Sequence, residues 1–187
     1  MLSGMVSSVG GKVITSGDNL TVDSDALFKS TSTNNIAIGR DSLDSTTDDA
    51  DNNIAIGVNA LTTMTTADGN IAVGYKSMQN HTSGSNNIAI GYQSMDGTGA
   101  NDCPTSTDNV FIGVNAGGGT WTTNDSNHNI GIGNNVLDAA MNGALYNVGV
   151  GSYSLSAVTT GISNVSIGYQ AGAIIADGNN NTCIGIS

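Results

Sequence analysis

A five-residue phrase, Asn-[Ile/Val]-x-[Ile/Val]-Gly, recurs nine times along this 187-residue chain. Its glycines lie 17 to 22 residues apart, and only Thr182 departs from the pattern at an apolar position. Each coil of such a repeat cannot bury its apolar face alone, so neighbouring coils stack into a solenoid. The spacing predicts an all-β, parallel β-solenoid (a β-helix or β-roll) of about ten 17–22-residue coils. The structural repeat positions are Asn35, Gly39, Asn53, Gly57, Asn70, Gly74, Asn87, Gly91, Asn109, Gly113, Asn129, Gly133, Asn147, Gly151, Asn164, Gly168, Asn181 and Gly185.

Within the phrase, two β-branched residues flank a small residue, which is replaced by Phe111 in one copy. Because side chains alternate across a strand, we expect the Ile and Val rows to form the core and the small residue to face the other way. The glycine is expected to take a positive φ or to leave no room for a Cβ. The asparagine is expected to stack on its neighbours or to cap backbone groups. A second apolar phrase, such as that around Leu61, predicts a second short strand in each coil.

The composition favours strands and turns over helices. All 15 acidic residues are Asp, Glu is absent, and 26 residues are Gly, so we expect little or no helix. The hydrophobic share of 38% is below the roughly 45–50% of ordinary domains, which indicates a thin core completed by oligomerisation. The net charge of −11 argues against nucleic acid and anionic membranes as partners, since both need a basic surface.

The chain divides into an N-terminal arm, residues 1–18, for attachment or assembly, and a β-solenoid repeat domain, residues 19–187. The first coil of that domain begins at Asn19 and matches the template if Asp23 replaces the glycine. Altered terminal coils serve solenoids as caps. The last coil stops two residues after Gly185 without a comparable cap. We expect this open strand edge to contact another subunit or protein, or to mark a cut within a longer chain.

No residue pattern indicates an enzyme, a cofactor or a metal. Without Glu and with scattered Asp, the chain lacks the paired carboxylates of glycan-degrading enzymes. His81 and His128 have no neighbour at metal-ligand spacing and are predicted to be surface turn residues. The acidic cluster within residues 41–51 is interpreted as a solvated edge in preference to a calcium site. Cys103 and Cys183 lie in different coils, too far apart for a disulfide within one chain.

The two longest intervals contain the candidate ligand loop. Residues 96–108 and 117–129 extend adjacent coils and carry the only Pro and the only Trp. Insertions in solenoids map to loops on one face, often the binding face. We therefore name Trp121, Asp102 and Asn124 as candidate ligand residues. An exposed Trp121 is suited to stacking on a sugar ring, and the alternative is that it packs over a loop or a subunit seam.

The phrases NNIAIGYQSM (86–95) and NVSIGYQAG (164–172) resemble repeats of bacteriophage tail-fibre and other virion-fibre β-solenoids. They are also similar to the head repeats of trimeric autotransporter adhesins. The resemblance covers residues 19–187 and implies a homotrimeric parallel β-solenoid that displays surfaces for attachment. The period of mostly 17–18 residues exceeds that of the adhesin heads, which favours the virion fibre.

The resemblance implies a structural, non-enzymatic segment of a fibre or spike in the virion, in a phage tail or capsid fibre, with a role in host-surface attachment. Its expected partners are other virion structural proteins, through the N-terminal arm or the open C-terminal coil, and host-surface glycan. Neither nucleic acid nor membrane is expected. The alternatives are a self-assembling extracellular filament subunit and an adhesin head on a bacterial cell surface.

Overall fold

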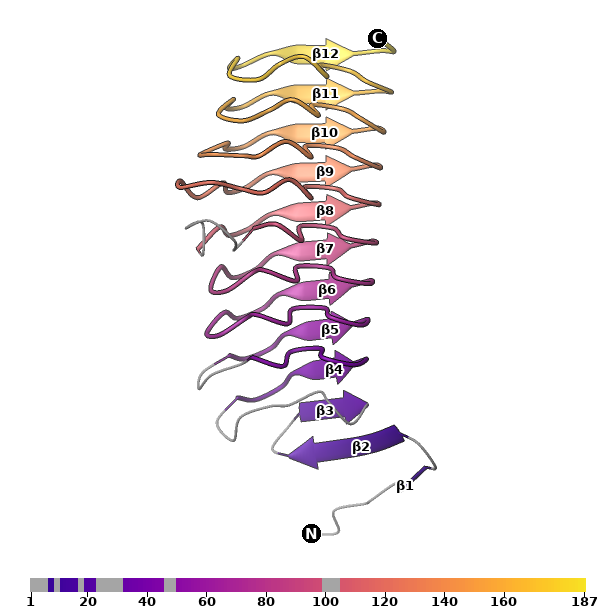
Figure 1. Ribbon diagram of the computed structural model, residues 1–187. Coiled ribbons are helices and arrows are strands. Elements are labelled where there is room, and N and C mark those ends of the chain that lie inside the picture. The colour runs from indigo at the N-terminus through magenta and orange to yellow at the C-terminus, as the bar shows by residue number, and fades with distance from the viewer. Residues whose placement is uncertain (1–6, 9–10, 17–18, 23–31, 46–49, 99–104) are drawn as a thin grey trace.

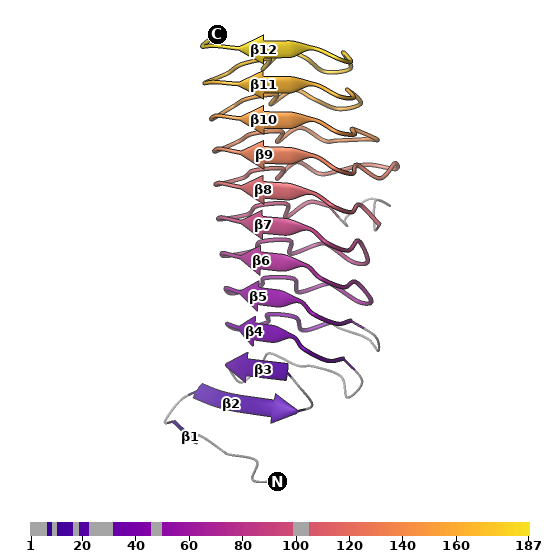
Figure 2. The ribbon, with the colours of Figure 1, turned by 180° about the vertical axis from the view of Figure 1, so that it is seen from behind.

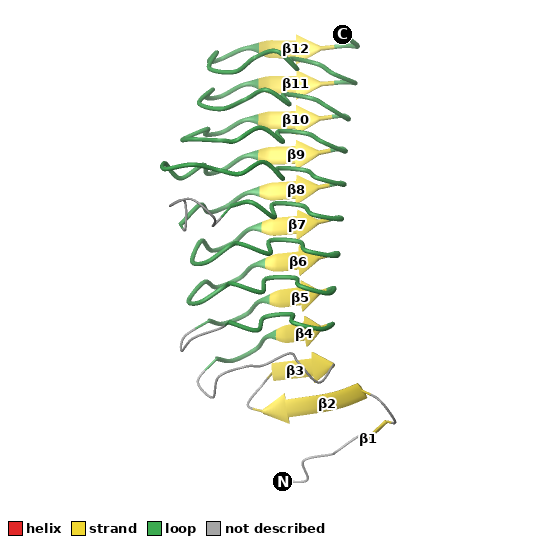
Figure 3. Ribbon diagram, viewed as in Figure 1, coloured by secondary structure: helices red, strands yellow, loops and turns green. Residues whose placement is uncertain are grey.

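The described part of the chain forms a single stack of strands. The computed structural model describes residues 7–8, 11–16, 19–22, 32–45, 50–98 and 105–187. These residues form twelve strands in chain order and no helix (Figures 1 and 3). The strands are β1 (Ser7–Ser8), β2 (Gly11–Ser16), β3 (Asn19–Val22), β4 (Ile36–Ile38), β5 (Ile54–Ile56), β6 (Ile71–Val73), β7 (Ile88–Ile90), β8 (Val110–Ile112), β9 (Ile130–Ile132), β10 (Val148–Val150), β11 (Val165–Ile167) and β12 (Thr182–Ile184).

Strands β3 to β12 are parallel, and each strand in this set pairs with its neighbours in chain order. Equivalent residues of the phrase lie opposite each other, as Ile54 does Ile71. Seen from behind, the strands form one column with the longer loops on one side (Figure 2). The prediction of an all-β parallel solenoid with little or no helix is therefore confirmed.

An antiparallel hairpin covers the N-terminal end of the stack. Strand β2 runs antiparallel to β3, with Val13 opposite Val22 and Ser16 opposite Asn19. Strand β1 pairs in turn with the first two residues of β2. The predicted N-terminal arm thus contains both strands, and β2 protects the outer edge of β3. Asp23 lies outside the described residues.

The strands present their β-branched residues to the outside, contrary to the sequence-based prediction. The middle residue of the phrase is buried, from Ala37 to Ser166, whereas the flanking Ile and Val are half-buried or exposed. A strand of three residues points only its middle side chain inward. The coil interior is narrow, and it is already occupied by side chains from the opposite turn, so only a small residue fits there.

The predicted second short strand is a tight turn. After Gly57, for example, Asn59 and Leu61 have left-handed φ values of 59° and 51°. The backbone N–H of Leu61 donates to the carbonyl of Ser77 in the next coil (3.1 Å), and that of Asn59 donates to Arg40 in the previous one (3.0 Å). In this turn, residues with left-handed φ values alternate with the others, so the segment is not extended. Its backbone N–H groups still form hydrogen bonds with the adjacent coils.

The core is a column of side chains stacked inside the coils. Small residues from the strand and the turn contact larger ones that follow them in the turn. The largest fully buried side chains are Leu43, Leu61, Met64, Met78, His81, Met95, Phe111, Trp121, Val136, Leu137, Met141 and Leu155.

The phrase glycines from Gly39 to Gly168 occupy corners where a side chain does not fit. From Gly39 to Gly168 these glycines have φ between 124° and 143°, where L side chains are strained. A Cβ on any of them would lie 2.0–2.8 Å from the backbone of the next phrase glycine. Both expectations for the glycine, a positive φ and no room for a Cβ, hold at these corners.

The phrase asparagines form a buried ladder along the stack. The side-chain oxygen of each accepts a hydrogen bond from the backbone N–H of the next asparagine, from the Asn19–Asn35 pair (2.7 Å) to the Asn164–Asn181 pair (3.0 Å). The Nδ2 group donates to a carbonyl of the following coil, as Asn129 does to Ala144 (2.8 Å). The amides therefore satisfy buried backbone groups at every bend.

Candidate functional site

The most extensive candidate surface is the outer face of the parallel sheet. Two columns of aliphatic residues run along it, and the residue after each phrase glycine forms a third column beside them. The columns comprise Leu20, Val22, Ile36, Ile38, Arg40, Ile54, Ile56, Val58, Ile71, Val73, Tyr75, Ile88, Ile90, Tyr92, Val110, Ile112, Val114, Ile130, Ile132, Asn134, Val148, Val150, Ser152, Val165, Ile167, Tyr169, Thr182, Ile184 and Ile186. We call this surface the apolar face.

The apolar face is exposed and almost uncharged. Ile132 is 41% exposed and Tyr92 is 49% exposed. Arg40 is the only charged residue in the columns within the described part of the chain, and no described aspartate lies there. With about 4.8 Å between strands and about 3.3 Å per residue, the face is roughly 45 Å long and 13 Å wide, or about 600 Å² in projection. Exposed apolar patches on monomers seldom exceed about 300–600 Å², and larger ones mark interaction sites.

Aromatic contacts order one border of the apolar face. The rings of Tyr75 and Tyr92 stack at 5.3 Å between centroids, and the Lys76 ammonium lies 5.5 Å from the Tyr75 ring. Farther along, Tyr153 and Tyr169 meet edge to face at 6.2 Å. These contacts join adjacent coils, so the border is preorganised for packing against a partner.

The predicted ligand platform at Trp121 is wrong. Trp121 is fully buried, its indole N–H donates to the carbonyl of Gly117 (3.0 Å), and its ring meets Phe111 edge to face at 5.9 Å. Phe111 occupies the strand position that alanine fills in other coils, and Gly131 and Gly117 leave the space for its ring. This coil therefore takes Trp121 into the core, where no sugar can reach it.

The other two predicted ligand residues are not joined into a site. Asp102 lies outside the described residues. Asn124 is exposed, and its backbone N–H and Nδ2 both donate to the Asn142 side-chain oxygen in the next coil (3.0 and 2.9 Å). These two hydrogen bonds hold the two loops in register.

His81 is buried, contrary to the prediction of a surface turn residue. Its Nε2 lies 2.8 Å from the carbonyl of Gly84 and its Nδ1 lies 2.9 Å from the Thr98 hydroxyl. Because a carbonyl only accepts, Nε2 carries the proton in the contact with Gly84. The Thr98 hydroxyl lies between Nδ1 and the carbonyl of Met95, which is 3.2 Å from it. Burial lowers the pKa of His81, which the hydrogen bond to Gly84 opposes in part. His81 is thus a neutral core residue.

Asp108, His128 and Tyr146 form an exposed group that the sequence analysis did not predict. Each of them directly precedes an asparagine of the ladder. The rings of His128 and Tyr146 are stacked at 5.0 Å with an interplanar angle of 3°, and His128 Nδ1 lies 3.8 Å from Asp108. All three residues have φ near 59°. These three residues hold the same position in successive copies of the phrase. An alignment of the coils by their asparagines would therefore have predicted that they lie one above another.

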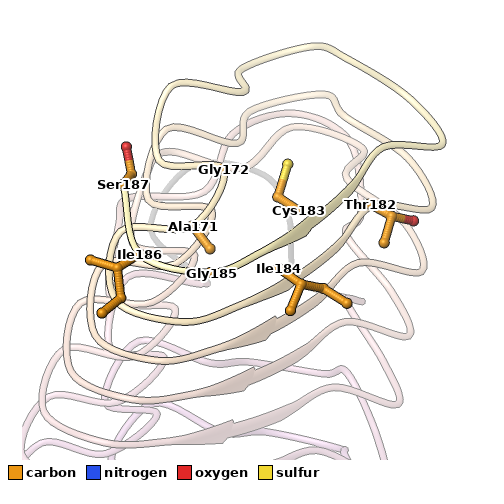
Figure 4. A pocket seen from close by; sticks show the side chains of 8 residues that line it. All are labelled: Ala171, Gly172, Thr182, Cys183, Ile184, Gly185, Ile186 and Ser187. Atoms are coloured by element: carbon orange, nitrogen blue, oxygen red, sulfur yellow. The ribbon is translucent and has the colours of Figure 1, made fainter.

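The C-terminal end of the stack forms an open hollow of about 350 Å³ (Figure 4). It is lined by Ala171, Gly172, Thr182, Cys183, Ile184, Gly185, Ile186 and Ser187. Cys183 carries a free thiol and points into the coil, whereas Ile184 and Ile186 point out of it. The lining carries no charged side chain.

Within the described ranges, no three His, Cys, Asp or Glu residues come together as a metal site. Asp48 and Asp49 of the acidic cluster lie outside those ranges. The same part of the chain contains no helix that is long and apolar enough to span a bilayer.

Comparisons of the chain with protein-family models, with curated proteins and with solved structures found no match. The class of protein therefore follows from the fold and its surfaces. The described residues form a parallel β-solenoid rod with an antiparallel hairpin at the N-terminal end of the stack and one apolar face along its length.

Proposed function

We propose that this chain is a structural, non-enzymatic rod segment of a virion fibre or spike, in which three copies pack through the apolar face. The observation that carries the proposal is the run of outward Ile and Val side chains that continues without a gap from β4 to β11, with Tyr75, Tyr92 and Tyr169 along its border. A soluble rod that leaves this face in water loses the hydrophobic free energy that its burial supplies.

The dimensions of the apolar face support lateral packing. Its projected area of about 600 Å² per chain approaches the roughly 800 Å² that each partner buries in a standard interface. At about 25 cal/mol per Å², its burial contributes about 15 kcal/mol per chain before the cost of association. The interior of a single coil is narrow, so lateral packing supplies the thicker core that one chain lacks.

The proposed threefold arrangement combines the sequence resemblance with the shape of the face. A face only about 13 Å wide is suited to packing around a common axis, because in a closed symmetric oligomer every chain buries the same face. Three chains carry three times the net charge of −11. The described aspartates lie off the apolar face, so their negative charges do not oppose packing through it.

The virion location and the role in host-surface attachment are supported by the resemblance of the phrase to virion-fibre repeats. Other virion proteins are proposed to bind at the ends of the rod. Glycan binding has lost its predicted aromatic platform at Trp121, so we propose attachment for the fibre as a whole and assign it no pocket.

Native mass spectrometry and sedimentation equilibrium at micromolar concentration test the lateral assembly. We expect a mass three times that of the 18.7 kDa chain. A monomer mass would refute packing through the apolar face, and a dimer mass would refute the threefold arrangement. Incubation with host polysaccharide tests the non-enzymatic role, because release of new reducing ends would contradict it.

A matched pair of lysine variants tests which face is buried. Ile167→Lys places a charge in the middle of the apolar face, and we expect it to yield monomers. Gln170→Lys lies three residues away in a left-handed turn position (φ 56°) where Lys76 stands in another coil (φ 58°). This control is expected to keep the oligomer, and dissociation of both variants alike would argue against the apolar face as the interface.

A further inference from the structure

We infer that the two sides of the apolar face interlock between neighbouring copies of this chain, with aromatic rings of one copy packed beside smaller residues of the next copy at the same coil. The inference rests on the proposed packing through the apolar face. It goes further because it specifies which residues meet, in which direction the copies run and in which register. The partner at this interface is a second copy of the chain.

Two rows of residues lie along the two sides of the apolar face. The leading row consists of the residue before each ladder asparagine, and the trailing row consists of the residue after each phrase glycine. The parallel strands all point the same way, so the leading row lies before their first residues and the trailing row beyond their last (Figure 1). From β4 to β11 the leading row comprises Asn34, Asn52, Gly69, Asn86, Asp108, His128, Tyr146 and Ser163, and the trailing row comprises Arg40, Val58, Tyr75, Tyr92, Val114, Asn134, Ser152 and Tyr169.

The rings of both rows are accessible to a partner. Tyr92 and Tyr169 of the trailing row are each 49% exposed, and Tyr146 of the leading row is 55% exposed. Tyrosine is enriched in protein interfaces, where its ring is buried and its hydroxyl reaches the polar rim. Four of the five tyrosines of the chain lie in these two rows, so the aromatic surface is concentrated at the two sides of the apolar face.

The two rows are complementary in size, coil by coil. The trailing row consists of Val, Tyr and one Arg except at Asn134 and Ser152, and these two residues lie in the two coils whose leading row carries the rings of His128 and Tyr146. The three trailing tyrosines have small or polar residues across from them in the leading row, which are Gly69, Asn86 and Ser163. All of these positions are described, and no coil from β4 to β11 has a ring in both rows.

Contacts within one chain do not explain this complementarity. Six residues separate the two rows of a coil, as from Tyr146 to Ser152, so their Cα atoms lie roughly 15–20 Å apart. A ring in one row therefore cannot touch the other row of its own chain. The stacking of His128 on Tyr146 at 5.0 Å runs along the leading row, and it does not determine which residues stand across the strand.

Packing around an axis parallel to the rods brings the two rows together. Rotation about such an axis does not shift a chain along it, so equivalent coils of all copies lie at one height. The trailing row of each copy then lies against the leading row of the next, and this heterologous contact closes into a ring. Tyr146 of one copy is placed beside Ser152 of its neighbour, and Tyr169 beside Ser163, so each ring covers the space that the smaller residue leaves.

Cysteine cross-linking in the full-length chain tests the direction and the register. In a Cys103→Ser, Cys183→Ala background, Asn52→Cys is combined either with Val58→Cys in the same coil or with Val114→Cys three coils away. Neither combination removes a ring. Asn52 and Val58 lie in opposite rows, too far apart for a short linker within one chain, so a short bifunctional maleimide joins them only between copies.

We expect the same-coil combination to give closed covalent oligomers on a denaturing gel, with a peptide pair that joins positions 52 and 58. Their mass is expected to equal that of the native lateral oligomer. The shifted combination is expected to lose this product, because three coils separate its cysteines by about 14 Å along the rod.

An exchange of a ring between the two rows tests the size complementarity. Ser152→Tyr puts rings in both rows of one coil, and we expect it to raise the concentration at which half of the oligomer dissociates by about tenfold or more, the effect of moderate overpacking. Adding Tyr146→Ser moves the ring from one row to the other, and the double variant is expected to dissociate within about threefold of the unmodified chain.

The two ring variants are designed to leave the fold of each chain intact. Each change introduces a residue type that the same row already carries in another coil, at Tyr169 and at Ser163. Circular dichroism melts are expected to be alike for the single and the double variant, so a difference in dissociation reports on the contact between copies.

Three results would overturn the inference. They are equal cross-linking of the two cysteine combinations, the absence of the peptide pair between positions 52 and 58, and equal dissociation of the single and the double ring variant. If the unmodified chain still has an oligomer mass in these cases, packing through the apolar face stands and only the interlocking of the rows fails. A monomer mass would overturn both proposals.

Discussion

The side-chain oxygen of Asn87 accepts a hydrogen bond from the backbone N–H of Asn109 at 3.0 Å, although 22 residues separate the two. The same bond spans 17 residues between Asn70 and Asn87 (2.9 Å). The ladder therefore keeps the coils in register while the loops between its rungs change in length. Insertions in this chain are absorbed outside the ladder.

Removing one rung is expected to destabilise the rod. In Asn129→Ala, the N–H of Asn147 and the carbonyl of Ala144 each lose a buried partner. At about 1–3 kcal/mol for each of these two unsatisfied buried groups, we expect a loss of about 2–6 kcal/mol in the free energy of unfolding. Urea unfolding followed by circular dichroism measures it.

Asn179→Ala is the control for this rung, because its side chain accepts from the backbone N–H of Ile162 (2.7 Å) in an exposed position outside the apolar face. Water replaces that bond, so a loss below about 1 kcal/mol is expected. Equal losses for the two variants would show that burial of the ladder contributes nothing.

Two glycine variants separate backbone strain from steric exclusion. Gly151→Ala places a Cβ 2.4 Å from the Gly168 carbonyl at φ 127°, whereas Gly185→Ala has φ 134° and meets nothing within 4 Å. Backbone strain is expected to destabilise both variants by about 1–3 kcal/mol. The steric clash is expected to destabilise Gly151→Ala alone by roughly a further 1–3 kcal/mol. Thermal melts are expected to rank Gly151→Ala below Gly185→Ala, and the reverse order would contradict the stacking geometry.

A double-mutant cycle tests how the core accommodates Phe111. A Cβ at Gly131 would lie 2.6 Å from the Phe111 ring, so Gly131→Ala alone is expected to cost about 1–3 kcal/mol. In a Phe111→Ala background the ring is gone, and the same change is expected to cost less than about 0.5 kcal/mol. Additive losses would mean that the two residues do not compete for space.

His81 is expected to make the rod sensitive to acid. Its pKa in the folded chain is lowered from 6.5 by burial, so below this pH the unfolded chain binds a proton that the folded chain does not. Stability is therefore full above about pH 6.5 and decreases as the pH falls toward the folded pKa. Urea midpoints at about pH 7 and about pH 5 measure the decrease.

The matched variant for this prediction is His81→Met, since Met64 fills the equivalent position one coil earlier. It removes the titrating group, so we expect a smaller decrease in the urea midpoint between the two pH values. An unchanged decrease would assign the acid sensitivity to other groups.

The repeat was sufficient to predict the stack of coils, because its asparagine and glycine are both required by contacts with the backbone of the next coil. At Gly91, φ is 143° and a Cβ would lie 2.1 Å from the Gly113 carbonyl. At Asn87, two backbone groups of the next coil need the side-chain amide. Constraints of this kind are local and recur in every copy, so one sequence reveals them.

The side of each strand that faces the core could not be predicted from the repeat in the same way. Alternation in Ile88-Ala89-Ile90 defines two faces but does not say which of them meets the core. The answer depends on the width of the coil and on the inward Leu and Met of the turn, such as Met95, which only the three-dimensional path brings opposite the strand. Trp121 was misplaced for a similar reason, because the space for it depends on Phe111.

The axial direction of the hydrogen bonds has a mechanical consequence. Every backbone and asparagine bond between coils lies along the length of the rod, so a pull on its two ends loads the coils in series. The weakest coil opens first and its neighbours hold. Each opening releases about 17 residues, which extend the chain by about 55 Å. A fibre built from such rods yields in steps under tension, and it absorbs work one coil at a time.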